Sequence, residues 1–179
     1  MVATDTQGQP RGCGSRRQYC FSHDGFRIEA VRITELLAHR YGSNPHVAAW
    51  QTDNEYGCHD TTLSYSPAAR DAFRNWCAQR YQSPDALNRA WGNVFWSMEY
   101  AQFDEIELPA LTVTEANPAT MMAFRRFSSD QVARFNLTQV YAIRRYSVVP
   151  LSLNYMCRIT DFYHFALVPH MEFATLDSY

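Results

Sequence analysis

The most informative stretch of the sequence is Val47-Ala48-Ala49-Trp50 followed by Gln51-Thr52-Asp53-Asn54-Glu55, which changes from apolar to polar within nine residues. A short apolar run of this kind is typical of a strand buried in a parallel sheet. The polar residues predict that this strand ends by delivering polar side chains, and Gly57 then allows a sharp turn. In parallel α/β proteins such side chains line a shared pocket at the carboxyl ends of the strands. We therefore expect the functional site at Asn54 and Glu55.

Helical patterns lie on both sides of this strand. Apolar residues recur at spacings of three and four between residues 26 and 41, and Gly42 predicts the end of that helix. A capping residue followed by proline is a typical helix start, and it occurs at Ser66-Pro67, Ser83-Pro84 and Asn117-Pro118. Residues 93–116 have no clear period and are expected to be irregular. The helix that begins after Asn117 is expected to be long, with an inner face that includes Phe124, Phe127, Val132, Phe135, Val140 and Ile143.

Two more strand candidates follow the long helix, at residues 151–155 and 173–179. Single strands that alternate with helices are typical of a parallel sheet, so we expect an α/β fold. A complete (β/α)₈ barrel typically needs about 250 residues. With 179 residues and so few strand candidates, the chain is too short to close such a barrel.

Composition and charge exclude several classes of protein. Hydrophobic residues make up 46% of the chain and charged residues 19%, with a formal net charge of −2, which excludes a disordered chain and makes nucleic acid a poor partner. No run approaches the roughly 20 apolar residues of a membrane span, and the N-terminus lacks the apolar stretch of a signal peptide. The five cysteines are odd in number and widely spaced, which favours reduced thiols. We therefore expect a cytoplasmic protein without a membrane partner.

Asn54 and Glu55 have the chemistry that cleavage of a sugar bond needs. A carboxylic acid can protonate a leaving glycosidic oxygen, and a neighbouring amide can hydrogen-bond a ring hydroxyl. Aromatic neighbours desolvate the carboxylate and offer stacking faces for a sugar. On the residues alone a second interpretation stays open, in which the two side chains merely cap a turn or the following helix.

Several motifs, in the expected order and spacing, resemble the β-galactosidases of glycoside hydrolase family 42. They are Gly-Ser-Arg-Arg-Gln-Tyr-Cys-Phe-Ser at 14–22, Trp-Gln-Thr-Asp-Asn-Glu-Tyr-Gly-Cys-His at 50–59, Ala-Trp-Gly-Asn-Val-Phe-Trp-Ser at 90–97 and Glu-Ala-Asn-Pro at 115–118. The resemblance runs from residue 8 to residue 179, and a string of motifs is far more specific than one Asn-Glu pair.

The resemblance implies a (β/α)₈ TIM barrel. Residues 1–179 would be a fragment of its catalytic domain, a partial barrel from the loop after strand three through strand six. The implied reaction is hydrolysis of terminal non-reducing β-D-galactosyl residues with retention of configuration, on a β-galactoside or galacto-oligosaccharide. No cofactor is implied. Because family members are often trimers, the resemblance implies a homo-oligomer.

The resemblance also implies roles for individual residues. Glu55 matches the acid/base carboxylate at the end of the fourth strand, and Asn54 matches the neighbouring amide that binds the sugar. Arg16 matches an arginine that the loop after the third strand presents toward the galactose, and Trp96 looks like the aromatic residue that walls the pocket. Two simpler interpretations stay open: Arg16 as a surface guanidinium in a flexible loop, and Trp96 as a packing residue.

The sequence departs from the family pattern in two respects. Some members carry a zinc cluster of four cysteines; Cys20 matches the first of them, but no cysteine follows Glu55 at the required short spacing, so we expect no metal site. A retaining glycosidase also needs a nucleophilic carboxylate about 5–5.5 Å from the acid/base. In this family that glutamate comes from the seventh strand, which we expect to be missing. The alternative function is therefore a catalytically inactive truncated remnant or a carbohydrate-binding fragment.

Overall fold

The computed structural model describes residues 1–156 and 158–177. The helices and strands follow one another in the order α1 (Asp24–Tyr41), β1 (Trp50–Asn54), α2 (Pro67–Tyr81), α3 (Pro84–Trp91), α4 (Pro118–Arg144), β2 (Leu151–Tyr155) and β3 (Phe173–Leu176). Short 3-10 turns form η1 (Phe95–Ser97), η2 (Phe103–Glu105), η3 (His164–Ala166) and η4 (Val168–His170). The predicted alternation of single strands with helices is confirmed.

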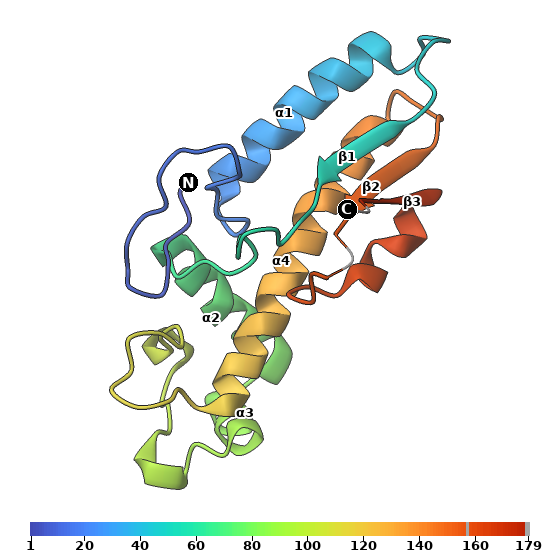
Figure 1. The fold of residues 1–179 in the computed structure, drawn as a ribbon. Helices are drawn as coiled ribbons and strands as arrows, with labels where there is room; N and C mark the ends of the chain where they lie inside the picture. Colours follow the sequence, from blue (N-terminus) through green and yellow to red (C-terminus); the bar gives the residue numbers. More distant parts are fainter. Residues whose placement is uncertain (157, 178–179) are drawn as a thin grey trace.

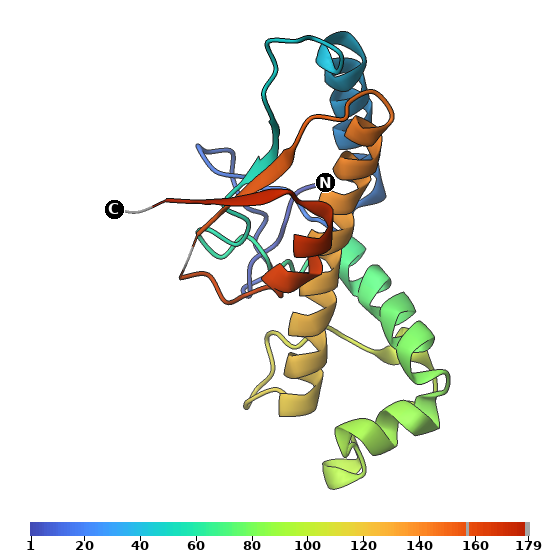
Figure 2. The same cartoon turned by 90° about the vertical axis from the view of Figure 1, so that its right-hand side faces the viewer.

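The strands form one parallel sheet in the order β1-β2-β3. Figure 1 shows the strands side by side, with α4 running behind them and α1 near α4. Figure 2, turned by 90°, shows both helices on the same side of the sheet. Leu151, Leu153 and Tyr155 pack among the helices, so Ser152 and Asn154 point to the opposite side, which we call the open face of the sheet.

Each predicted helix start is confirmed. A side chain accepts a hydrogen bond from a backbone N–H of the first turn, and a proline follows it, at Ser66, Ser83 and Asn117. Helix α3 ends at Gly92, whose φ of 67° lies in the left-handed region that favours glycine. Gly42, which follows α1, is needed for another reason: its φ of −61° is open to any residue, but a Cβ there would collide with the carbonyl oxygen of Tyr146.

Helix α4 contributes to two cores. Its predicted inner-face residues are all buried: Phe124, Phe127, Val132, Phe135, Val140 and Ile143. The C-terminal half of α4 packs under β2. The N-terminal half packs against α2 and α3 in an aromatic cluster that we call the insertion core, formed by Phe73, Cys77, Leu87, Trp91, Ile106, Ala123, Phe124 and Phe127.

Strand β1 differs from the prediction in its bounds. The apolar residues 47–49 precede the strand, which is Trp50–Asn54. The reason is pairing: the Trp50 N–H donates to the carbonyl of Pro150 at 2.9 Å, and the ladder with β2 begins there. The last strand candidate, 173–179, is confirmed over Phe173–Leu176, whereas residues 178 and 179 lie outside the described residues.

Candidate active site

A β-bulge decides which side chains β1 presents. Gln51 lies opposite Ser152 and Asn54 lies opposite Asn154, so β1 has one more residue than β2 between these pairs. In a regular strand, side chains two residues apart share a face, and Asp53 would lie with Gln51. The extra residue places Asn54 there instead, on the open face of the sheet.

Glu55 follows directly and is only 1% exposed. Its backbone N–H donates to the carbonyl of Asn154 at 2.8 Å, and its φ is 51°. This left-handed conformation costs a non-glycine residue roughly 1–2 kcal/mol, so surrounding contacts must enforce it. The Oε2 atom accepts hydrogen bonds from Arg16 Nη1 at 3.0 Å and from Asn54 Nδ2 at 3.2 Å. The Oε1 atom is buried without a hydrogen-bond partner among the described residues.

Arg17 makes several of the contacts that hold Glu55 in this conformation. Its Nη1 donates to the carbonyl of Glu55 at 3.2 Å, and its Nη2 donates to the carbonyl of Asn54 at 2.6 Å. The same guanidinium pairs with the Asp53 carboxylate and lies 5.1 Å from the ring centroid of Tyr56. A planar guanidinium can serve several acceptors at once, so Arg17 holds the end of β1 in its bulged form. Sequence reasoning missed this residue, although it stands beside Arg16 in the 14–22 motif.

Tyr56 fixes the other side of this turn. Burial, and next the Asp53 carboxylate, raise the pKa of Tyr56 well above its usual value, so the phenol stays neutral. Its hydroxyl donates to Asn136 Oδ1 at 3.2 Å, which ties the residue after Glu55 to the middle of α4. The acidic side chain is therefore carried by a segment that is anchored to both the N-terminal loop and the long helix.

A second amide lies next to Asn54 on the open face. Asn154 Nδ2 donates to Asn54 Oδ1 at 2.8 Å and to Asp177 Oδ2 at 2.8 Å. These two residues were not predicted as part of the site. The period-two pattern of 151–155 could have indicated Asn154, because its position on the open face follows from the buried Leu153 and Tyr155 on either side.

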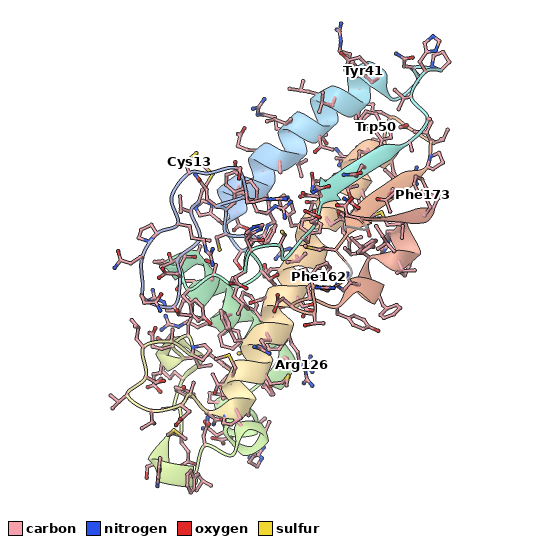
Figure 3. The ribbon with its side chains drawn as sticks, in the orientation of Figure 1. Cys13, Tyr41, Trp50, Arg126, Phe162 and Phe173 are labelled. Carbon is pink, nitrogen blue, oxygen red and sulfur yellow. The ribbon has the colours of Figure 1, made fainter. Side chains whose placement is uncertain are left out.

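A groove of about 590 Å³ opens beside Arg16, between the N-terminal loop and the turn after β1, and its lining includes Arg11, Arg16, Arg17, Gln18, His59 and Thr61. Figure 3 shows polar side chains crowded around the end of β1, the strand that begins at the labelled Trp50. The site thus combines a buried carboxylate with hydrogen-bond donors and an adjoining polar groove. This combination suits a polyhydroxylated ligand.

Trp96 lies elsewhere. Its side chain is 76% exposed and stacks on Phe95, with ring centroids 4.9 Å apart. Figures 1 and 2 both show η1 at the lower end of the molecule, whereas β1 lies in the upper half. Asn93 and Asn117 hold the base of this loop through a hydrogen bond of 3.0 Å. The structure thus brings Arg16, Asn54 and Glu55 together but not Trp96, whose role stays a prediction.

The cysteines do not form a metal cluster in the described part of the chain, where no group of three or more His, Cys, Asp or Glu residues could hold a metal ion. Cys20 accepts a hydrogen bond from Ser66 Oγ at 3.3 Å, and Cys58 Sγ lies 2.8 Å from His59 Nδ1. Cys157 lies outside the described residues. No helix in the described ranges is long and apolar enough to cross a membrane.

The whole chain, residues 1–179, matches the glycoside hydrolase family 42 model, described as beta-galactosidase. It is 48% identical over 180 residues to a beta-galactosidase of Thermus thermophilus, a match that covers 100% of this chain and 28% of the relative. Its structure matches that of a beta-galactosidase from the psychrophilic Marinomonas ef1, with 53% identity and a TM-score of 0.98 over 100% of this chain and 27% of that one.

A polyextremophilic beta-galactosidase of the Antarctic haloarchaeon Halorubrum lacusprofundi gives a TM-score of 0.96 at 42% identity, over 99% of this chain and 27% of that one. The expected α/β fold, a partial (β/α)₈ TIM barrel, is confirmed by these neighbours. The chain spans about 28% of the length of the Thermus relative. The chain belongs to the β-galactosidases of glycoside hydrolase family 42.

Proposed function

We propose that this chain supplies the acid/base part of the active site of a β-galactosidase, as a fragment of its catalytic barrel domain. The reaction is hydrolysis of terminal non-reducing β-D-galactosyl residues with retention of configuration. One observation carries the proposal: a buried glutamate, Glu55, stands at the carboxyl end of a parallel strand with one oxygen held by two donors and the other without a partner among the described residues.

The two oxygens of Glu55 have different roles. Oε2 accepts hydrogen bonds from Arg16 and Asn54, so in the protonated form the proton lies on Oε1. Oε1, which is buried in this chain, donates this proton to the leaving glycosidic oxygen once the groups that cover it move aside for the substrate. After the leaving group departs, the same oxygen accepts a proton from the water that attacks the galactosyl-enzyme. Because Oε2 stays bonded throughout, the carboxyl group keeps its orientation between the two steps.

Arg16 and Asn54 bind the galactosyl unit in this proposal. The Arg16 side chain is 45% exposed and borders the groove, so it can reach a sugar hydroxyl while it remains near Glu55. Asn54 Nδ2 bonds Glu55 and lies beside the reacting position. Trp96 is also proposed to contact the substrate. Because it lies away from the groove beside Arg16, that contact would be made elsewhere on the molecule.

The nucleophile is proposed to be a glutamate outside these 179 residues. The chain spans only 28% of the Thermus relative, and the paired carboxylates of a retaining glycosidase need a separation of about 5–5.5 Å. Two carboxylates suffice for this chemistry, so the proposal includes no cofactor. The assembled enzyme is proposed to be a cytoplasmic homo-oligomer, with a trimer as the expected state, which light scattering would measure.

The test uses a chimera in which this chain replaces the matching span of the Thermus β-galactosidase. We expect the chimera to hydrolyse lactose, and Glu55→Gln to lower kcat on lactose by about 10²–10⁴-fold because general-acid assistance is lost. The loss should be smaller on a nitrophenyl galactoside, whose leaving group needs no proton. Azide should then restore turnover and release β-galactosyl azide. Glu29→Gln, an exposed carboxylate on α1, is the control and should match the parent chimera.

The alternative, a fragment that is inactive or only binds carbohydrate, makes different predictions. It requires that the chimera shows no turnover; galactose binding measured by calorimetry would then indicate a carbohydrate-binding fragment, and the absence of binding an inactive remnant. The 179-residue chain alone is expected to show no hydrolysis. Turnover by the chain alone that Glu55→Gln abolishes would place the nucleophile within these residues and contradict the proposal.

A further inference from the structure

Four side chains are joined in a row by three hydrogen bonds that cross the sheet. Asp177 accepts from Asn154, Asn154 donates to Asn54, and Asn54 donates to Glu55, over distances of 2.8, 2.8 and 3.2 Å. The three strands each contribute to it, because Asn54 ends β1, Asn154 lies in β2 and Asp177 follows β3. The sheet therefore links the acidic side chain of Glu55 to its far edge.

The direction of these hydrogen bonds follows from the carboxylate of Asp177, at which the row ends. An ionised carboxylate only accepts hydrogen bonds, so Asp177 requires the NH₂ group of Asn154, and not its carbonyl, on that side. The same NH₂ group has a second proton, which points at Asn54 and requires the carbonyl of Asn54 to face it. The NH₂ group of Asn54 must then face Glu55. The Asn54 amide is thereby held in one orientation, and the bond from Asn154 at 2.8 Å is shorter than the second bond that Asn54 Oδ1 accepts, from Gln51 Nε2 at 3.4 Å.

Burial makes this orientation costly to lose. Asn154 is 8% exposed and Glu55 is 1% exposed, so a reversed amide would bring two acceptors together without water to separate them. A reversed Asn54 would point its carbonyl at Glu55 Oε2 and remove one of that oxygen's two donors. Of its two donors, Oε2 would then keep Arg16 alone, so the two oxygens of the carboxyl group would differ less in their hydrogen bonding.

We propose that Asn154 is a positioning residue, which fixes the amide of Asn54 and through it the orientation of Glu55, with Asp177 setting the direction. This inference rests on the proposed function of Glu55. Asn154 acts through Asn54 and is not itself proposed to transfer a proton. Its Oδ1 atom has no hydrogen-bond partner among the described residues, so both of its assigned contacts use the NH₂ group.

The decisive variant is Asn154→Asp in the chimera. The change keeps the shape but replaces the NH₂ group by an acceptor, so Asn54 should turn over and present its carbonyl to Glu55. We expect kcat/KM at neutral pH to fall roughly 100-fold, the size of effect that a misplaced reacting group produces, mostly through kcat. Two neighbouring carboxylates hold a proton between them at higher pH than one alone. A protonated aspartic acid can donate to Asn54, so the deficit should shrink as the pH falls.

A double variant separates positioning from folding. Adding Asp177→Asn removes the repulsion between two carboxylates, so Asn154→Asp/Asp177→Asn should regain thermal stability while its neutral-pH activity stays low. Ser152→Ala is the matched control: Ser152 lies on the same strand and face, two residues from Asn154, and its hydroxyl pairs with Thr175. It should behave as the parent chimera. Asn154→Ala, which adds no charge, serves if the aspartate variant does not fold, and should lose activity without the recovery in acid.

Crystal structures of the parent and variant chimeras test the inference without activity. The separation between the Asn54 side chain and Glu55 Oε2 should increase in Asn154→Asp and stay unchanged in Ser152→Ala. An unmoved Asn54–Glu55 pair, or a pH profile parallel to that of the parent, would overturn the inference. A displaced pair in a chimera whose turnover is insensitive to Glu55→Gln would support positioning and refute the proposed function, so the two failures are distinguishable.

Discussion

The end of β1 and the insertion core are held together by different kinds of interaction. Around Glu55 the chain relies on charged and polar contacts, a β-bulge and a left-handed backbone, with Arg16 and Arg17 as donors. In the insertion core, aromatic rings pack on one another, and Phe73 lies 5.5 Å from Phe124 between ring centroids. Apolar burial stabilises a fold without fixing the position of any one polar atom, whereas directional bonds fix position at little net gain in stability. Variants in the two regions should therefore fail in different ways.

Phe73→Ala should have the largest effect. Phe73 is 0% exposed at the centre of the insertion core, and a phenylalanine truncated to alanine in a core costs about 3–5 kcal/mol. We expect a much lower urea midpoint for the chimera and an unchanged kcat for the molecules that remain folded. The comparison variant is Val148→Ala, whose side chain is 95% exposed here and which should change stability by less than about 0.5 kcal/mol. A lowered kcat without loss of stability would break the division between the regions.

Arg17→Lys should have a smaller effect, and on activity more than on stability. Lysine keeps the charge but cannot reach the carbonyls of Asn54 and Glu55 together with Asp53. If the end of β1 shifts and displaces Glu55, kcat/KM should fall by up to about 100-fold, the size of effect that a misplaced reacting group produces.

Steady-state kinetics and a thermal melt on the same preparation would separate the two quantities. Arg32→Lys, at an exposed pair with Glu29 on α1, is the control and should leave both unchanged. Equal losses of stability and activity in Arg17→Lys would show that Arg17 serves the fold rather than the site.

The smallest effect should come from Glu172, which lies at the amino-terminal end of β2, away from the site. The hydrogen bond from the Leu151 N–H, and to a lesser extent Arg144, hold the pKa of Glu172 below its usual value. A carboxyl whose pKa is lowered on folding stabilises the folded state above its unfolded pKa, and this gain is lost as the pH falls through the folded value. Glu172 is largely exposed, so solvent screening keeps the gain small.

Thermal melts between pH 7 and pH 3 should therefore show a slightly shallower acid destabilisation in Glu172→Gln than in the parent chimera, with kcat unaffected at neutral pH. Identical pH dependence in the two proteins would show that the pair with Leu151 contributes nothing to stability.

Local chemistry made the helices predictable, and long-range contacts made parts of the site unpredictable. Ser66, Ser83 and Asn117 each carry their helix start in adjacent residues. The bulge in β1 depends on pairing with β2, about 100 residues away in the sequence. No residue type near Gln51 predicts it. The motifs indicated Arg16, Asn54 and Glu55, which the structure brings together. Arg17 and Asn154 were missed because their contacts join distant segments. Arg16, whose contact is as distant, was indicated by the family resemblance.

The bulge in β1 also decides which side chains of this strand lie on each face of the sheet. If β1 paired with β2 as a regular ladder from Gln51 onward, Asp53 would lie opposite Asn154, and a carboxylate would lie on the open face where the carboxamide of Asn54 now lies. The regular strand would form more easily, but it would not present the carboxamide on which the proposed site depends. A chain of this family that was optimised for regular strand pairing alone would thus lose the site first.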